Sequence, residues 1–190
     1  MRVSAAETTV TIIDVPWPHA NGSRTNSGKS PKYPLMTLRE IAALSPTVKK
    51  EVGEHAVACC WATAPHLPGA IDTLKAFGFI YRSFRIWRKR KIACGFWVRS
   101  DAEIVLIGER GRPAAPRHLR RTIFDGDPVT PEFHSSKPDE LHNMADLAWP
   151  EARKIELFAT REREGWECYG ADLGHMITPD GIVPLTERTA

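Results

Sequence analysis

The sequence has no long apolar run and no recognisable metal or redox motif. No stretch approaches the ~20 apolar residues of a membrane-spanning helix, and the first residues lack the pattern of a secretory signal. The 4 cysteines include no C-x-x-C pair, and the 7 histidines include no H-E-x-x-H pair. We therefore expect a cytoplasmic protein with free thiols and no metal ion. No G-x-G-x-x-G follows an expected strand, which disfavours a nicotinamide-dependent enzyme.

What is present is an uneven distribution of charge. The 190 residues are 42% hydrophobic and 26% charged, a balance that suits one globular domain spanning residues 1–190. The formal net charge is only +3, yet residues 82–121 hold twelve Lys or Arg and three acids. A local excess of positive charge attracts phosphates and is typical of nucleic-acid-binding proteins, although a solvated basic face gives the same pattern.

Hydrophobic periodicity predicts alternating strands and helices. Apolar and β-branched runs predict strands at residues 10–13, 55–63, 79–87, 102–107, 122–124, 154–158 and 166–169. Helical spacing predicts helices at residues 37–44 and 66–77 and a third after a capping box formed by Ser136 and Asp139. Residues 19–34 and 128–136 are expected to be loops, and the tail beyond residue 174 to be a hairpin or loose. This alternation predicts an α/β fold of three layers with a mostly parallel sheet.

The most informative segment is Asp14-Val15-Pro16-Trp17, directly after the first expected strand. In open α/β sheets, ligands bind at the carboxyl ends of the strands, which is the place of this loop. A carboxylate and a neighbouring backbone carbonyl can accept the hydrogens of an aromatic amine, and an aromatic ring can stack on a base taken out of its helix. An Asp at a strand end is also a common turn residue, so the loop alone leaves both readings open.

The loop resembles the D-P-P-W motif of the MT-A70 family of adenine methyltransferases, and further similarities follow in the same order. Y-P-L-M-T-L at residues 33–38 resembles the family's Y-P-T-M-S-L, and C-W-A-T at 60–63 resembles L-W-V-T. G-F-W-V-R-S-D-A-E at 95–103 is similar to G-Y-W-T-R-S-N-A-E, and H-S-S-K-P-D-E at 134–140 to H-S-R-K-P-D-E. Residues 153–158 resemble R-x-x-E-L-F, and Gly165, Trp166 and Gly170 resemble the closing glycines and tryptophan. The resemblance covers about residues 10–173.

This resemblance implies a circularly permuted Rossmann-like methyltransferase, of the short bacterial or phage kind. It would use S-adenosylmethionine to methylate the exocyclic amine of adenine, in DNA rather than RNA. The catalytic residues would be Asp14, Val15, Pro16 and Trp17. The cofactor-binding residues would be Asp14, Lys137, Glu156, Leu157, Phe158, Thr160, Arg161 and Asp172. The nucleic acid would be bound by Tyr33, Trp17, Arg88, Lys89, Arg90, Lys91, Arg99, Arg117, Arg120 and Arg121.

The resemblance also implies individual roles. Asp14 would lie between the cofactor's amino group and the adenine amine, and Lys137, at a helix N-terminus, would meet the methionine carboxylate. The turn at Thr160 and Arg161 would approach the ribose. Tyr33 and Trp17 would flank the target base.

Three positions depart from the family pattern. Val15 replaces the first proline of the loop, Thr160 stands where many members carry a basic residue, and Ala171 stands where the family has an asparagine. Asp172 could compensate for the missing amide by accepting a hydrogen bond from a ribose hydroxyl. The sequence therefore supports an active enzyme on DNA, with two alternatives: an inactive nucleic-acid-binding module that has lost the cofactor, and an RNA adenosine methyltransferase.

Overall fold

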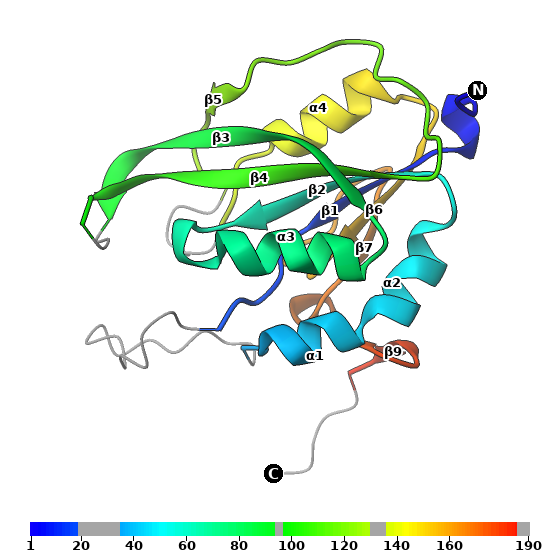
Figure 1. Ribbon diagram of the computed structural model, residues 1–190, viewed down its shortest axis with the longest axis horizontal. Coiled ribbons are helices and arrows are strands. Elements are labelled where there is room, and N and C mark those ends of the chain that lie inside the picture. Colours follow the sequence, from blue (N-terminus) through cyan, green and yellow to red (C-terminus); the bar gives the residue numbers. More distant parts are fainter. Residues whose placement is uncertain (19–34, 94–96, 130–135, 186–190) are drawn as a thin grey trace.

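A seven-stranded, mostly parallel sheet forms the middle of the protein. The computed structural model describes residues 1–18, 35–93, 97–129 and 136–185. Its strands are β1 (Thr9–Ile13), β2 (Ala56–Ala62), β3 (Ile80–Ala93), β4 (Ser100–Arg110), β5 (Ile123–Asp125), β6 (Arg153–Leu157) and β7 (Glu167–Tyr169). They follow the order β5-β3-β4-β2-β1-β6-β7, and β4 runs antiparallel to both of its neighbours (Figure 1). The remaining pairings are parallel, as the sequence predicts.

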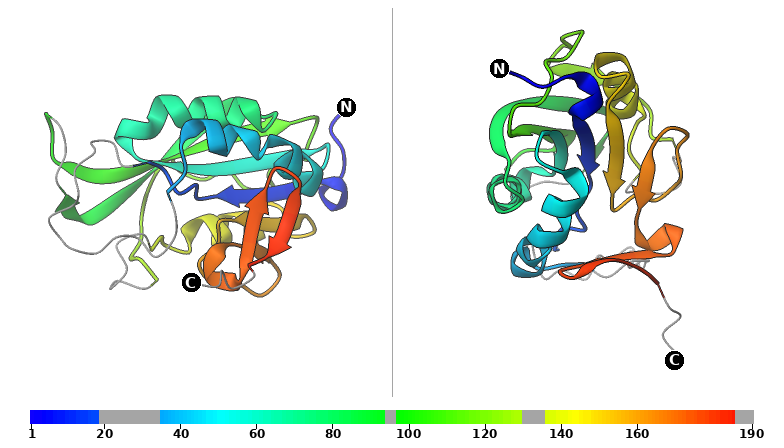
Figure 2. Two further views of the ribbon diagram at one scale, coloured as in Figure 1. Left: turned by 90° about the horizontal axis from the view of Figure 1, so that it is seen from below. Right: turned by 90° about the vertical axis from the view of Figure 1, so that its right-hand side faces the viewer.

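Helices cover both faces of the sheet. The helices α1 (Leu38–Ala43), α2 (Ser45–Val52) and α3 (Leu67–Ala76) lie on one face, and α4 (Glu140–Ala148) lies on the other (Figures 1 and 2). A small hairpin of β8 (His175–Thr178) and β9 (Gly181–Pro184) follows β7 and meets α2. Short 3₁₀ helices occur at Ala5–Glu7, Ala64–His66 and Ala171–Leu173. Among the residues described, no helix is long and apolar enough to cross a membrane.

The period-two side-chain pattern of the central strands separates two cores. Every residue of β2 is buried. In β1, Val10 and Ile12 pack with α4, whereas Ile13 packs with α1 to α3. Because alternate residues of a strand face opposite sides of a sheet, a continuous apolar run is needed where both faces are covered. The apolar runs at residues 10–13 and 55–63 therefore indicate the centre of the sheet.

Local signals explain where two of the helices begin and end. Thr37 caps α1, because its side chain accepts from the backbone N–H of Glu40 while the Glu40 carboxylate accepts from the backbone N–H of Thr37. The chain leaves α3 through Gly78, whose φ of +84° lies in the left-handed region that glycine adopts without strain. Both ends agree with the prediction from the sequence.

The structure differs from the predicted elements in three places. The sequence analysis missed α2, which follows α1 directly with Leu44 between them. The strands expected at residues 79–87 and 102–107 are longer than predicted, since β3 continues through basic residues to Ala93 and pairs with β4, which begins at Ser100. The capping box expected at Ser136 is wrong, because α4 begins only at Glu140 and its cap residue, Asp139, makes no side-chain cap hydrogen bond.

Candidate active site

Asp14 emerges at the carboxyl edge of the sheet, between the ends of two parallel neighbours. Its predecessor Ile13 is level with Cys60 of β2 and with Leu157 of β6. The backbone N–H of Asp14 donates to the carbonyl of Leu157 at 3.3 Å, which extends the β1–β6 pairing by one residue. The sheet therefore fixes the backbone from which the Asp14 carboxylate projects.

A row of alternating charges leads from the long hairpin to Asp14. The Lys137 ammonium donates to Asp14 Oδ2 at 2.8 Å and lies 3.7 Å from Glu103 Oε2. Glu103, only 8% exposed, also pairs with Lys89 on β3. The half-buried Asp14 and the buried Glu103 thus alternate with two lysines, and the Lys137 ammonium lies 5.4 Å from the centre of the Trp61 ring.

Burial dominates the ionisation of Asp14. Loss of solvent raises the pKa of the Asp14 carboxyl above its ordinary value, while the charge and hydrogen bond of Lys137 act to lower it. The neighbouring carboxylates of Glu103 and Glu156 raise this pKa further. The carboxylate therefore binds a proton more readily than an exposed aspartate, and Lys137 opposes this effect.

Trp17 is held in one orientation by groups from the end of β2. Its indole Nε1 donates to the carbonyl of Trp61 at 3.2 Å. Its ring stacks on His66, with the ring centres 5.7 Å apart and the planes 12° from parallel. His66 is itself fixed, because Nδ1 lies 2.8 Å from the Thr63 hydroxyl. One face of the indole is therefore supported by a second ring.

The backbone of the loop is also anchored. The N–H of Trp17 donates to the carbonyl of Val15 at 2.8 Å, and the N–H of Met36 donates to the carbonyl of Pro16 at 3.0 Å. A carbonyl oxygen has two lone pairs, so each of these oxygens can accept one more hydrogen bond. These two hydrogen bonds hold the backbone of the loop, which has Val15 where the family pattern has proline.

Asp14 lines a cavity of about 420 Å³ at the same edge of the sheet. Its other walls come from the residues around α1, the turn after β6, the start of the 3₁₀ helix after β7, and β8 with the residue that follows it. In the turn, Phe158 has a φ of +65°, a conformation that is strained for a bulky residue and often occurs at ligand sites. Position 170, which lies against this turn, requires glycine, since a Cβ there would lie 2.0 Å from the Ala159 carbonyl oxygen.

The residues that the resemblance assigns to the cofactor are only partly brought together. Four of them line the cavity: Asp14, Phe158, Thr160 and Asp172. Leu157 lies beneath in the core. The other three do not line the cavity and have protein partners: Lys137 binds Asp14, Glu156 lies 2.8 Å from the ring nitrogen of His142, and Arg161 pairs with Asp139.

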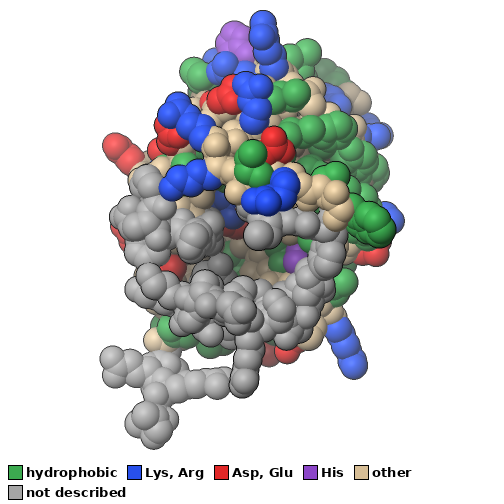
Figure 3. Space-filling model, turned by 90° about the vertical axis from the view of Figure 1, so that its left-hand side faces the viewer, with side chains coloured by type: hydrophobic (Ala, Val, Ile, Leu, Met, Phe, Trp, Pro, Cys, Tyr) green, Lys and Arg blue, Asp and Glu red, His purple; other side chains and the backbone are tan. Residues whose placement is uncertain are grey.

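The basic residues of 82–121 fall into two classes. Several are neutralised by a nearby acid: Arg88 by Asp125 through two hydrogen bonds, Lys89 by Glu103, Arg90 by Asp127 and Arg117 by Glu151. Five others are exposed and form no ion pair with the acids that the structure describes: Lys91, Arg99, Arg112, Arg120 and Arg121. Figure 3 looks onto the hairpin end of the molecule, where Lys and Arg side chains gather with acidic ones between them. Tyr33 lies outside the described residues.

Three contributors to this site were not predicted from the sequence. Glu103 was the last residue of a recognised motif, so its position was marked but its role was not. His66 follows the W-A-T strand by three residues and carried no signal of stacking. The cavity wall formed by β8 lies in the tail that was expected to be a hairpin or loose. No group of three or more metal-ligating side chains occurs in the part of the chain that is described.

Comparison with known proteins agrees with this architecture. A family profile described as MT-A70 matches residues 8–172. The type II methyltransferase M.MunI of Mycoplasma sp is 28% identical over 153 residues, which cover 77% of this chain and 62% of that protein. An N(6)-adenosine-methyltransferase MT-A70-like protein of Arabidopsis thaliana is 30% identical over 64% of this chain and 19% of its own length. A similarly named Drosophila melanogaster protein is 27% identical over 82% of this chain and 27% of its own length.

Proposed function

The chain belongs to the MT-A70 family, and from this membership we propose that it transfers a methyl group from S-adenosylmethionine to the exocyclic amine of adenine in DNA. The observation that carries the proposal is the half-buried Asp14 carboxylate, which lies between the Lys137 ammonium and a cavity large enough for a nucleoside-sized ligand. We favour DNA because the relative matched over 62% of its own length is a bacterial type II methyltransferase.

The cavity suits S-adenosylmethionine in size and in polarity. Its volume of about 420 Å³ lies within the range of ligand pockets, and apolar side chains make up most of its wall. Asp14 would accept from the amino group, and Asp172 from a ribose hydroxyl. The bound cofactor would supply an electrophilic methyl group.

The residues of the loop would activate and hold the acceptor. The lone pair of the adenine amine is delocalised into the ring, so acceptors that bind its hydrogens make the nitrogen a better nucleophile. The Asp14 carboxylate and the free lone pair of the Val15 or Pro16 carbonyl would serve as these acceptors. Trp17, backed by His66, would stack on the extruded base. Lys137 would keep Asp14 ionised. For Lys137 also to contact the methionine carboxylate of the cofactor, the ion pair between Lys137 and Asp14 would have to loosen.

Circular permutation is part of the proposal. The Asp14 loop follows the first strand of the chain, whereas Phe158, Thr160 and Asp172 come from its last third. The exposed basic residues of the long hairpin and of the segment after β4 would bind the phosphates.

A second candidate function rests on two residues of the cavity wall. Thr160 and Ala171 line the cavity without the basic group and the amide that the family pattern has there. A protein that had lost the cofactor would keep nucleic-acid binding alone. Incubating the purified protein with S-adenosylmethionine and either unmethylated DNA or RNA, followed by mass spectrometry of the nucleosides, separates these functions. Methyladenine in DNA supports the proposal, methyladenosine in RNA alone corrects the substrate, and no product with intact nucleic-acid binding favours the second candidate.

A further inference from the structure

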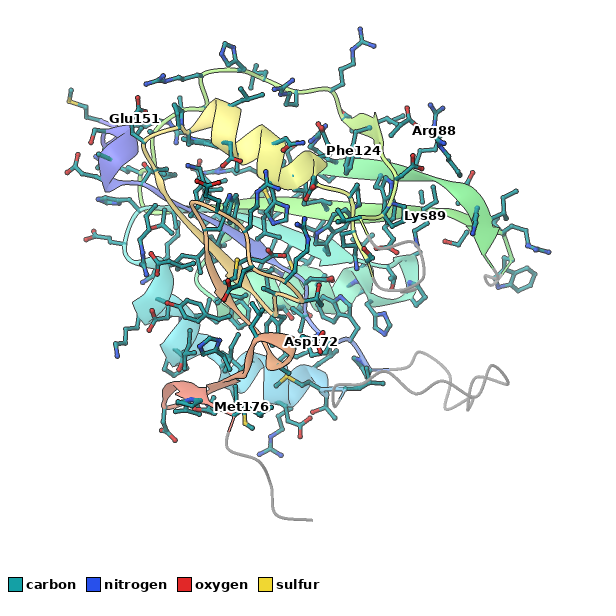
Figure 4. All side chains as sticks on the ribbon, turned by 180° about the vertical axis from the view of Figure 1, so that it is seen from behind. Arg88, Lys89, Phe124, Glu151, Asp172 and Met176 are labelled. Carbon is teal, nitrogen blue, oxygen red and sulfur yellow. The ribbon has the colours of Figure 1, made fainter. Side chains whose placement is uncertain are left out.

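Part of the cavity wall lies outside the region that the family profile covers. The profile ends at residue 172, whereas β8 begins at His175. All residues from 175 to 179 line the cavity. Figure 4 shows the labelled Asp172 and Met176 at the end of the molecule remote from Arg88 and Lys89. The tail that follows the family motifs is therefore a component of the candidate cofactor site.

The hairpin of β8 and β9 is fixed to the rest of the fold. Ile177 is buried in the core that includes α1 to α3, and Ile182 packs against the same core. The Thr47 hydroxyl of α2 donates to the Thr178 carbonyl at 2.5 Å. Figure 2 shows the hairpin beyond β7 as a separate pair of strands. Its cavity-lining residues thus have a defined position, as a binding wall requires.

The wall of the cavity is mostly apolar, with the carboxylates of Asp14, Glu40 and Asp172 and the ring of His175 among its polar groups. Asp14 places a carboxylate at the sheet edge, where a cationic amino group would bind. The hairpin and the segment around α1 contribute apolar side chains, namely Met176, Ile177, Pro179, Leu35, Met36 and Leu44. A flat purine ring has apolar faces and buries well between such side chains.

We propose that the β8–β9 hairpin binds the adenosine end of the methyl donor, with Met176 against the purine ring. This inference rests on the proposed function, because it assumes that the cavity holds S-adenosylmethionine. It assigns a ligand-binding role to a segment outside the family-matched region. Met176 is a cofactor-affinity residue and takes no part in the transfer step.

Two matched variants test the role of Met176. Met176 and Val183 are direct partners across the hairpin and are 40% and 41% exposed, but only Met176 lines the cavity. The Met176→Glu and Val183→Glu variants therefore place the same charge at the same depth. Isothermal titration would measure the binding of S-adenosylhomocysteine and of methylthioadenosine, which lacks the amino-acid end.

We expect Met176→Glu to weaken both ligands by about tenfold or more, since a carboxylate against the ring is desolvated without a partner. Val183→Glu should change either affinity less than about twofold. Asp14→Asn should weaken S-adenosylhomocysteine and spare methylthioadenosine. Thermal unfolding without ligand should be equal for the two Glu variants, which separates a binding effect from a folding effect.

Several results would overturn the inference. Equal affinity of Met176→Glu and the unaltered protein, or an equal loss in Val183→Glu, would show that the hairpin does not contact the ligand. A loss for S-adenosylhomocysteine alone would place the amino-acid end at the hairpin. If the unaltered protein binds neither ligand, the proposed function fails together with this inference, whereas binding unaffected by Met176→Glu removes the inference only.

Discussion

Replacing Asp14 by Asn should stop methyl transfer and leave the fold about as stable as before. The substitution keeps the shape of the side chain but removes its negative charge. At the 2.8 Å between Lys137 Nζ and Asp14 Oδ2, two unit charges attract each other by about 6 kcal/mol at an effective dielectric constant of ~20. Burying each ion costs several kcal/mol in return. Because the pKa of Asp14 is raised, burial together with the neighbouring carboxylates of Glu103 and Glu156 outweighs the attraction of Lys137.

The attraction between Asp14 and Lys137 and the cost of burying the two ions nearly cancel in the free energy of unfolding. Lys137 keeps Glu103 at 3.7 Å after the substitution, so its charge stays compensated. We expect the free energy of unfolding to change by no more than about 1 kcal/mol, against the ~3–5 kcal/mol typical of a broken buried pair. The rate of methylation should fall at least about 100-fold, the usual effect of removing one group that stabilises the transition state.

The pH dependence of stability tests independently whether ionisation of Asp14 stabilises or destabilises the folded protein. A carboxyl whose pKa is higher in the folded state than its ordinary 3.8 binds its proton more tightly in that state. The stability that Asp14 contributes is therefore present at pH values below its unfolded pKa and lost as the pH rises through the folded pKa. The stability of Asp14→Asn relative to the unaltered protein should increase over that window and then level off.

The assays are chemical denaturation across pH and methylation of DNA with labelled S-adenosylmethionine. Asp72→Asn is the control, because Asp72 forms an exposed ion pair with Lys75 on α3, 3.3 Å apart. It should alter neither stability nor rate. If Asp14→Asn kept more than about a tenth of the activity, or lost 3 kcal/mol or more of stability, the reasoning would be refuted, because Asp14 would then be a structural residue.

The same site predicts the pH profile and the salt dependence. Lys137→Gln removes the cation that lowers the pKa of Asp14, so the acid limb of the pH–rate profile should move to higher pH. Glu103→Gln removes a carboxylate that raises this pKa, so the limb should move to lower pH, and equal directions in the two variants would contradict the assignment. Lys91→Ala should reduce the slope of log affinity for DNA against log salt by about one. Arg88→Ala should reduce this slope less, because Asp125 already neutralises Arg88. Equal slopes in the two variants would argue against dividing the basic residues into neutralised and unpaired ones.

A neighbouring acid provides a control for Glu103. Glu109 lies on the same strand and binds two cations, Arg2 and Arg82. These two arginines are not part of the row of alternating charges that ends at Asp14. Glu109→Gln should therefore leave the acid limb unshifted.

The elements with a strict period were predicted from the sequence, and those formed by tertiary pairing were not. The apolar runs of β1, β2 and β6 and the spacing of α3 carry their own signal. The last third of β3 has basic residues that favour no strand, and it is extended because β4 pairs with it. The signal for α2 was present, since Val48 and Val52 are one turn apart and Pro46 suits a helix start, but its eight residues follow α1 without a break.

For the candidate site, the sequence singled out positions but not the contacts between them. Asp14 and Lys137 were singled out for the cofactor, and the structure brings them to each other across 123 residues of chain. Motif order reveals which residues gather at the sheet edge, because parallel strands end there together. It does not reveal which partner each charge takes, since that depends on distances of a few ångströms. Glu156 is a second example: the resemblance assigns it to the cofactor, and in the structure it pairs with His142 of α4.

The two borders of the sheet have a consequence for how the protein behaves in concentrated solution. Each border is a strand of three residues, β5 on one side and β7 on the other. Such short borders offer few free backbone groups for a strand from another molecule. Along β3 beyond Arg88, where β5 has ended, the exposed positions include Arg90 and Lys91. Asp127 neutralises Arg90, but the charge of Lys91 would repel the same charge of a second copy, which opposes edge-to-edge pairing at this end of β3.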